Sequence, residues 1–220
     1  KEYEVPAPIS IAAQATNDRV EVSSRQETAT TLSSQPVSAD SADAQTPSAW
    51  PANVIEQVRL ADQHVLAGDL PAAQHALCRA LELAPNDPEL IVVYGNILLR
   101  AGDVEGARRE FVKATVLAPE DAAAHSNLAA VLLHLGRAED AEASARRALA
   151  LNSDDTDALK VLARICLDSE RYTEAVQAYV AILRVKPDDL ETLLVAGNCY
   201  AEAGRPEEAT TFYQRVLQLD

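Results

Sequence analysis

The chain has 220 residues, of which 48% are hydrophobic and 24% charged, enough apolar side chains for one or two folded domains. Its 34 acidic residues outnumber its 19 lysines and arginines, and the net charge of −15 disfavours nucleic acid and anionic lipid surfaces as partners. Aromatic residues make up only 4% and glycines number 7, which favours packed helices over a β-sandwich or barrel. We therefore expect an all-α protein.

Three scattered cysteines, Cys78, Cys166 and Cys199, have neither the number nor the spacing of a disulfide framework or a metal site. We expect small buried thiols in a reducing compartment, and hence a cytoplasmic protein. No run approaches the roughly 18 apolar residues of a transmembrane helix, so direct membrane insertion is not expected. The sequence holds no methionine, even at position 1, and an upstream signal or anchor remains compatible with it.

Residues 1–50 are rich in Ser, Thr, Ala and Gln and have no sustained helical period, so we expect a flexible tail or linker. The exception is the stretch 18–24, where Val20 and Val22 alternate with polar residues as in a short edge strand. At the end of the segment, we expect Trp50 and Pro51 to pack over the first helical hairpin as its cap.

From about Pro51 onward, apolar residues recur at three-and-four spacing and are interrupted regularly by glycine, proline or acidic clusters, which predicts a series of helical hairpins. The pattern repeats every 34 residues. The recurring residues are Gly68, Gly102, Gly136 and Gly204, then Ala73, Ala107, Ala141, Ala175 and Ala209, and finally Pro85, Pro119 and Pro187. Glu170 stands in the skipped glycine place and Ser153 in the skipped proline place. The folded domain, 51–220, thus contains five units: 54–87, 88–121, 122–155, 156–189 and 190–220.

The recurring residue types explain the period. A glycine after the first helix permits a left-handed turn, and a proline after the second helix cannot continue it, so each unit is two tightly joined helices. Alanine on the second helix lets the two backbones approach closely. Since one hairpin cannot bury both of its faces, neighbouring hairpins must stack.

The run Tyr94-Gly95, Gly102, Ala107, Phe111, Ala114 and Pro119 resembles the tetratricopeptide repeat, and the likeness covers about three-quarters of the chain. The resemblance implies a right-handed superhelix, or α-solenoid, of stacked antiparallel helix pairs. It also implies that the first helix of every pair lines a concave groove that takes an extended peptide or a partner helix. An aromatic residue often found early in the first helix of such repeats is replaced here by Gln57, Ile91, His125, Leu159 and Leu193.

No catalytic pattern accompanies the repeats. His64, His75, His125 and His134 include no pair at the i, i+4 spacing that places two metal ligands on one helix face. The sequence also has no phosphate-binding glycine loop and no G-x-S-x-G nucleophile motif. We therefore expect no enzyme activity, no cofactor and no metal, and we look for function on a surface.

The resemblance turns one face of each first helix toward the groove. The apolar residues on these faces are Val58, Val65, Val92, Leu99, Leu133, Leu167 and Leu194, and the polar residues are Asp62, Asn96, Arg100, Asn127, His134, Lys160, Arg164, Asp168 and Asn198. Asparagine and arginine at such places can bond a ligand's main chain or carboxylate. The alternative interpretation of each polar residue is an ordinary solvated helix position.

Some relatives grip a C-terminal carboxylate with two asparagines and several basic residues from three successive units. Asn96 and Asn127 match the asparagines, but Val92, Asp157 and Val161 stand where the basic residues would be, which argues against that specialised site. The asparagine ladder of sugar-transferring relatives is also missing, since the places equivalent to Asn127 hold Arg59, Val93, Val161 and Val195.

The sequence thus predicts a scaffold that binds a protein or peptide segment in the groove. One alternative is a non-catalytic arm of a larger bacterial enzyme, of the glycosyltransferase or methyltransferase type. Another is a homo-oligomer formed through an uncovered C-terminal face at Val216, Leu217 and Leu219. The N-terminal tail could also occupy the groove in cis, because a tethered segment has a high effective concentration.

Overall fold

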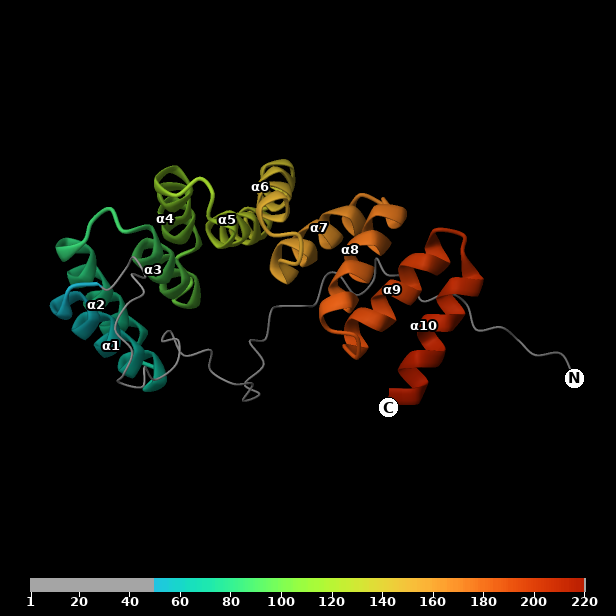
Figure 1. Cartoon of the computed structure of the whole chain (residues 1–220), viewed down its shortest axis with the longest axis horizontal. Coiled ribbons are helices and arrows are strands. Elements are labelled where there is room, and N and C mark those ends of the chain that lie inside the picture. Colours follow the sequence, from blue (N-terminus) through green and yellow to red (C-terminus); the bar gives the residue numbers. More distant parts are fainter. Residues whose placement is uncertain (1–49, 220) are drawn as a thin grey trace, which may run out of the picture. The chain divides into compact units, whose positions relative to one another are not determined.

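The computed structural model describes residues 50–219, which form ten α-helices and no strand (Figure 1). In chain order the helices are α1 (Ala52–Leu66), α2 (Leu70–Leu83), α3 (Pro88–Arg100), α4 (Val104–Leu117), α5 (Ala122–His134), α6 (Ala138–Leu151), α7 (Thr156–Asp168), α8 (Tyr172–Val185), α9 (Leu190–Glu202) and α10 (Pro206–Leu219). The predicted all-α class is therefore confirmed for this part of the chain. Residues 1–49, with the expected strand at Val20 and Val22, lie outside the described residues.

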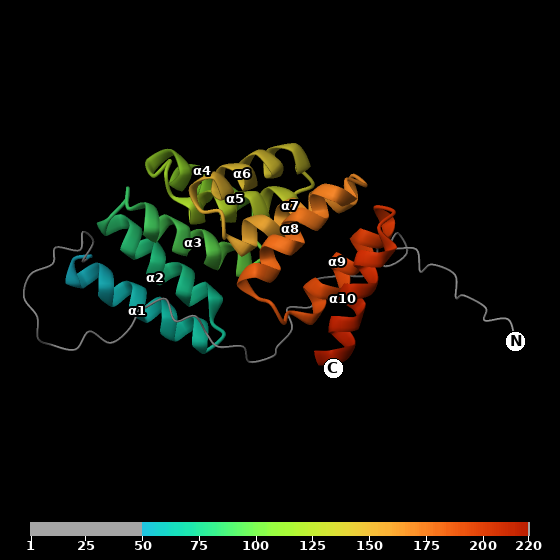
Figure 2. The same cartoon turned by 45° about the vertical axis from the view of Figure 1, so that its right-hand side comes forward.

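Consecutive helices pack in pairs: α1 with α2, α3 with α4, α5 with α6, α7 with α8 and α9 with α10. The second helix of each pair also packs against the first helix of the next pair, so the five pairs form a continuous stack. Figures 1 and 2 show this succession of hairpins from α1 to α10. The arrangement is the α-solenoid that the sequence predicts, with the first helices of the pairs on one face and the second helices on the other.

Five aspartates begin helices by capping them. Each stands just before its helix and accepts a hydrogen bond from a backbone N–H of the first turn: Asp69, Asp87, Asp103, Asp121 and Asp155. Such a bond satisfies an otherwise unpaired donor, and the negative charge favours the positive end of the helix dipole. These carboxylates between helices therefore have a structural role.

The turn inside each pair needs a left-handed backbone. In four pairs the residue is a glycine, with φ between 73° and 84°. In the fourth pair, between α7 and α8, it is Glu170, with φ of 57°. A residue with a side chain pays roughly 1–2 kcal/mol for this conformation. Glu170, which departs from the glycine pattern as the sequence shows, thus forms the same turn at a local energetic cost.

Small residues line the seam between paired helices. Ala73, Ala107, Ala141 and Ala175 are fully buried, in agreement with the expected close approach of the backbones. On α3, a Cβ added at Gly95 would lie 2.6 Å from Cε1 of Phe111, which is too close for any real contact. The seams therefore accept little added volume.

Trp50 caps the first pair as predicted. Its ring packs against the first hydrophobic cluster, around Val54 and Leu90, and its Nε1–H donates a hydrogen bond to Oδ2 of Asp87 at 2.9 Å. The same Asp87 caps α3 through Oδ1. One carboxylate therefore ties the start of the described chain to the second pair.

Three of the four joints between successive pairs share a contact that we call the loop clasp. In it, a lysine or arginine side chain on the second helix of one pair contacts the loop that ends the preceding pair. The contacts are Lys113 Nζ to the carbonyl oxygen of Pro85 (2.7 Å), Arg147 Nη2 to that of Pro119 (3.3 Å), and Arg215 Nη2 to Oδ1 of Asp188 (3.0 Å). Each clasp uses the same place of the 34-residue register on α4, α6 and α10.

The joint between the third and fourth pairs has no such base, because its place holds Ala181, and the proline place holds Ser153. A cluster of four charged side chains on α6 and at the start of α8 is found there instead: Glu142, Arg146, Arg171 and Glu174. Glu142 receives Arg146 at 2.5 Å and Arg171 at 2.9 Å, and Arg171 also lies 3.2 Å from Glu174. We call this the charge cluster.

Candidate partner-binding groove

The apolar part of the expected groove lies on the first helices as a row of half-buried side chains. Val65, Leu99, Leu133 and Leu167 each pack against the core and remain partly accessible. Val92 is also half-buried, whereas Val58 is only 7% exposed and belongs to the core, and Leu194 is 47% exposed. Each side chain of the row therefore packs against the core on one side, which helps to hold the pairs together, and is accessible to a ligand on the other.

Cationic groups lie beside this row on α3 and α7. Arg100, Lys160 and Arg164 are exposed. The Nε of Arg164 donates to both carboxylate oxygens of Asp168, at 3.0 and 3.2 Å, one helical turn further on. Because both side chains are more than half exposed, this pair contributes little stability, and Arg164 can exchange Asp168 for another carboxylate at small cost.

The amides and the acid of the candidate groove are less accessible than its cations. Asn96, Asn127 and Asp62 are half-buried, and burial raises the pKa of the Asp62 carboxyl above its ordinary value. His134 is exposed at the end of α5. Asp62, Asn96 and Arg164 share one place of the 34-residue register, which holds Ala130 in the third pair, so this place changes from acid to amide to methyl to guanidinium along the stack.

Asn198, expected on the groove face, is bonded within its own hairpin. Its Oδ1 accepts a hydrogen bond from the Tyr213 hydroxyl at 2.7 Å, across the seam between α9 and α10. The ring of Tyr213 also lies over Gly197, where a Cβ would come within 2.6 Å of it. Asn198 is thus held by its own hairpin through the carbonyl oxygen, and its NH₂ group has no protein acceptor among the described residues.

Two apolar residues on α1 that were not predicted as groove residues are strongly exposed. Ile55 is 47% exposed and Leu66 is 76% exposed. Leu66 lies 34 residues before Arg100 and 68 before His134, so the same register that selected those residues could have found it. At this place the first pair therefore presents an apolar side chain where the second and third pairs present polar ones.

Burial makes two of the three cysteines poor nucleophiles. Cys166 and Cys199 are buried, as expected, and burial raises both thiol pKa values, that of Cys199 to about 11. Cys78 is half-buried, with its Sγ 3.3 Å from the Tyr94 hydroxyl. Thiols that stay protonated at neutral pH neither attack carbonyl groups nor bind metal readily.

Residues 50–219 contain no group of three or more His, Cys, Asp or Glu side chains placed to hold a metal ion. Within the same range, every helix is too short or too polar to cross a membrane.

Family models of the tetratricopeptide repeat match residues 58–116 and 95–156, and a second model of the same description matches 132–191 and 166–220. No curated protein matches the chain by sequence.

Several solved structures share the fold. A crystal structure of MamA protein is 23% identical, with 76% of this chain and 91% of that chain covered and a TM-score of 0.67. MamA from residue 41 to its end, from Desulfovibrio magneticus RS-1, is 20% identical, with coverage of 77% and 96% and a TM-score of 0.67. YrrB, described as a TPR protein with an unusual peptide-binding site, is 22% identical, with coverage of 76% and 86% and a TM-score of 0.61. At these identities the likeness extends to the fold alone.

Proposed function

This chain belongs to the tetratricopeptide repeat family, and on that premise we propose that it is a non-catalytic scaffold that binds a peptide segment of a partner protein along its first-helix face. The fold itself supports a role in protein interaction. The peptide-binding site named for YrrB belongs to that protein, and it supports the finer proposal only as a precedent on the same fold.

One observation carries the proposal: exposed cations lie beside a half-buried row of leucines on the first helices. Among the described residues, Arg100 and Lys160 have no ion pair or side-chain hydrogen bond, and Arg164 has only its exposed neighbour Asp168. These cations can pair locally with an acidic group of a ligand, against the long-range repulsion from the chain's net charge of −15. The leucine edges would contact its apolar side chains, and Asn96 and Asn127 would bond its main chain.

The test is a pull-down from the native extract with the full chain and with a variant carrying Asn96→Ala, Asn127→Ala and Arg164→Ala. The matched control carries Gln214→Ala, Gln218→Ala and Arg109→Ala, which remove two amides and one guanidinium from exposed places on second helices. We expect the partner to be retained by the control and its affinity for the groove variant to fall at least about tenfold. A partner that binds both variants as it binds the wild type would contradict the groove.

A second candidate function, self-association, is favoured by two exposed leucines on α10. Leu217 is 79% exposed and Leu219 is 42% exposed. Light scattering at two protein concentrations would show a species larger than a monomer that a Leu217→Ser, Leu219→Ser variant lacks. A monomer at both concentrations would contradict self-association.

Residues 1–49 would compete with the partner if they enter the groove in cis. Their deletion should then raise partner affinity, and an unchanged affinity would contradict this regulation.

A further inference from the structure

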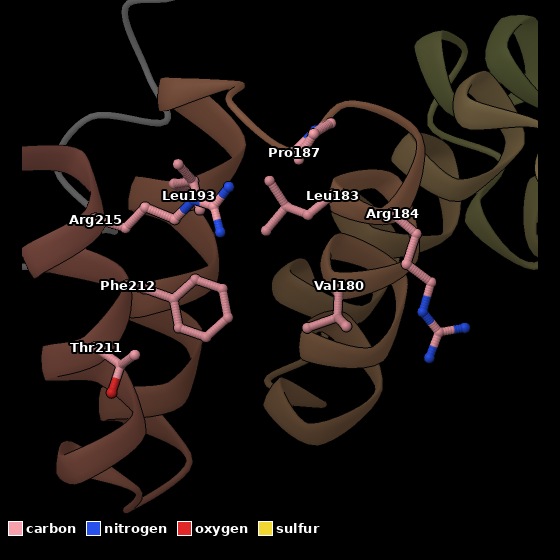
Figure 3. A pocket seen from close by; sticks show the side chains of 8 residues that line it. All are labelled: Val180, Leu183, Arg184, Pro187, Leu193, Thr211, Phe212 and Arg215. Atoms are coloured by element: carbon pink, nitrogen blue, oxygen red, sulfur yellow. The ribbon is translucent and has the colours of Figure 1, made fainter. Parts of the chain in front are cut away.

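A second surface suited to binding lies among the helices of the last two pairs. A cavity of about 270 Å³ is lined by Val180, Leu183, Arg184, Pro187, Leu193, Thr211, Phe212 and Arg215. Figure 3 shows Val180 and Leu183 pointing from α8 toward Phe212 on α10, across the open space. The buried side chain of Leu193 on α9 forms the inner wall of the cavity. The cavity lies mainly between second helices, and none of the residues of the candidate partner-binding groove lines it.

A neighbouring cavity extends this surface along α8. It measures about 350 Å³ and is lined by Thr173, Val176, Gln177, Val180, Arg184, Tyr200 and Arg205. The two cavities share Val180 and Arg184, and they meet where the ring of Tyr200 stacks on that of Phe212, with centroids 5.1 Å apart. We call the two together the outer groove.

The same gap one pair earlier, between α6 and α8, has a different chemistry. It is lined by Arg146, Leu159, Leu162, Glu174, Gln177 and Ala178. There Arg146 lies 3.8 Å from Glu174, so charged groups bridge the gap. In the 34-residue register Val180 replaces Arg146 and Phe212 replaces Ala178. These two replacements remove the bridge and give the later gap an apolar lining.

The charged residues that line the outer groove are all arginines. Arg205 pairs with Glu208 and lies 4.9 Å over the Tyr200 ring, while Arg215 pairs with Asp188 at 3.0 Å. These ion pairs are about half exposed on both sides, so their loss costs little when a ligand supplies a better placed carboxylate. Arg184 has no ion pair among residues 50–219, and its guanidinium is turned away from Phe212 in Figure 3, at the rim of the cavity.

We propose that the outer groove docks an acidic peptide segment of a partner protein, with an apolar side chain inserted between Val180, Leu183 and Phe212 and carboxylates paired with Arg184 and Arg215. The complementarity of charge selects this occupant. The charged side chains of the lining are all cations, and the nearby carboxylates of Glu208 and Asp188 already pair with two of them, so a basic segment finds no free acid there and an uncharged one leaves the arginines unused. This site is separate from the one proposed on the first helices, and either can exist without the other.

The test begins with an unbiased probe. The full chain is used to select from a phage library of random 12-residue peptides, and the leading peptide is synthesised, labelled and measured by fluorescence anisotropy. We expect selected sequences to combine Leu, Ile or Phe with two or more Asp or Glu. Selection without acidic residues would overturn the proposal.

Two variants and one control locate the site. Arg184→Glu with Arg215→Glu reverses its charge, and Val180→Arg installs the residue that the earlier gap already accommodates at Arg146. Each should weaken the peptide at least tenfold while circular dichroism stays unchanged. The matched control, Arg79→Glu with Arg109→Glu, reverses two exposed arginines on α2 and α4 and should bind as the wild type does.

Two further outcomes would overturn the proposal. In the first, the peptide binds the charge-reversal and Val180→Arg variants normally but is lost from the variant with Asn96→Ala, Asn127→Ala and Arg164→Ala, which would place it in the first-helix groove. In the second, light scattering shows a dimer that Val180→Arg dissociates, which would make a second copy of this chain the occupant. A peptide that the charge-reversal and Val180→Arg variants lose, and that the variant with Asn96→Ala, Asn127→Ala and Arg164→Ala retains, supports the outer groove. That result does not depend on whether the first-helix groove binds a ligand.

Discussion

The joint between the third and fourth helix pairs and the joint between the second and third are built from the same 34-residue pattern but closed by different interactions. In the earlier joint, Arg147 reaches the carbonyl oxygen of Pro119 and the carboxylate of Glu120. In the later joint, both the base and the proline are missing, at Ala181 and Ser153. Both places that form the clasp in the earlier joint therefore hold other residues in the later one.

The comparison teaches that stacked repeats can exchange one way of closing a joint for another. The charge cluster lies on the second helices, as the clasps do, but its Glu142 is far more protected from solvent than the acid of a clasp. The Glu142 side chain is 16% exposed, and that of Glu120 is 75% exposed. Removal of the charge cluster should therefore affect stability more than removal of a clasp.

The largest expected effect comes from Glu142→Ala. This change leaves Arg146 and Arg171 with only their longer contacts to Glu174 and should lower the free energy of unfolding by about 2 kcal/mol. Urea unfolding followed by circular dichroism measures it. The control Arg147→Ala, which removes a clasp with its contacts to Pro119 and Glu120, should cost less than about 0.5 kcal/mol. Equal losses in the two variants would remove the distinction between the joints.

The next effect concerns the turn inside the fourth pair. Glu170→Gly should raise the free energy of unfolding by about 1 kcal/mol, since glycine adopts the φ of 57° without a steric penalty. Gly136→Ala, at the equivalent turn one pair earlier with φ of 73°, should lower it by a similar amount. Thermal unfolding of the two variants tests both expectations. A destabilised Glu170→Gly protein would show that the glutamate side chain has a stabilising contact.

A smaller effect should follow from installing a clasp in the joint that lacks one. The double change Ser153→Pro and Ala181→Arg restores both partners, and Asn152 already has the extended backbone that proline requires of the preceding residue. We expect a gain of about 0.5 kcal/mol from an exposed contact of this kind. A double-mutant cycle in urea should give a coupling between the two changes, and simple additivity would mean that no clasp forms.

The smallest expected effect is a change with pH. The hydrogen bond from Arg171 holds the pKa of Glu142 below its ordinary value, partial burial opposes this, and the charge of Arg146 adds to it. Because the folded pKa is the lower one, the stabilisation is complete above the unfolded pKa and is lost as pH falls through the folded pKa. The stability difference between wild type and Glu142→Gln should therefore shrink between pH 6 and pH 3, measured by urea midpoints. A constant difference would contradict the titration of Glu142.

The fold was predictable from the sequence because it depends on local patterns. The glycine turns and the buried alanines follow from the 34-residue register, and they determine which helices pair. The register also indicates which face of a helix a residue occupies, which is why Arg100 and Lys160 could be placed on the exposed first-helix face and Leu99 in its apolar row.

What the register could not supply is the partner of each side chain. The bond from Tyr213 to Asn198 and the contacts of Glu142 depend on distances between helices that are separated in sequence and on the rotamers of long side chains. The cavity beside Phe212 depends on a large residue that replaces alanine at a single place in the pattern. The periodicity identifies such a place but does not predict whether the volume around it is filled.

The chain's single tryptophan makes one end of the solenoid observable on its own. Trp50 rests on the first pair and bonds to Asp87 at the start of the second, so its fluorescence will report the opening of that end while the other four pairs contribute only to circular dichroism. Repeat arrays unfold one unit at a time when neighbouring contacts are weak, and cooperatively when they are strong. Agreement or disagreement of the two signals along one denaturation curve thus measures how far cooperativity extends through this protein.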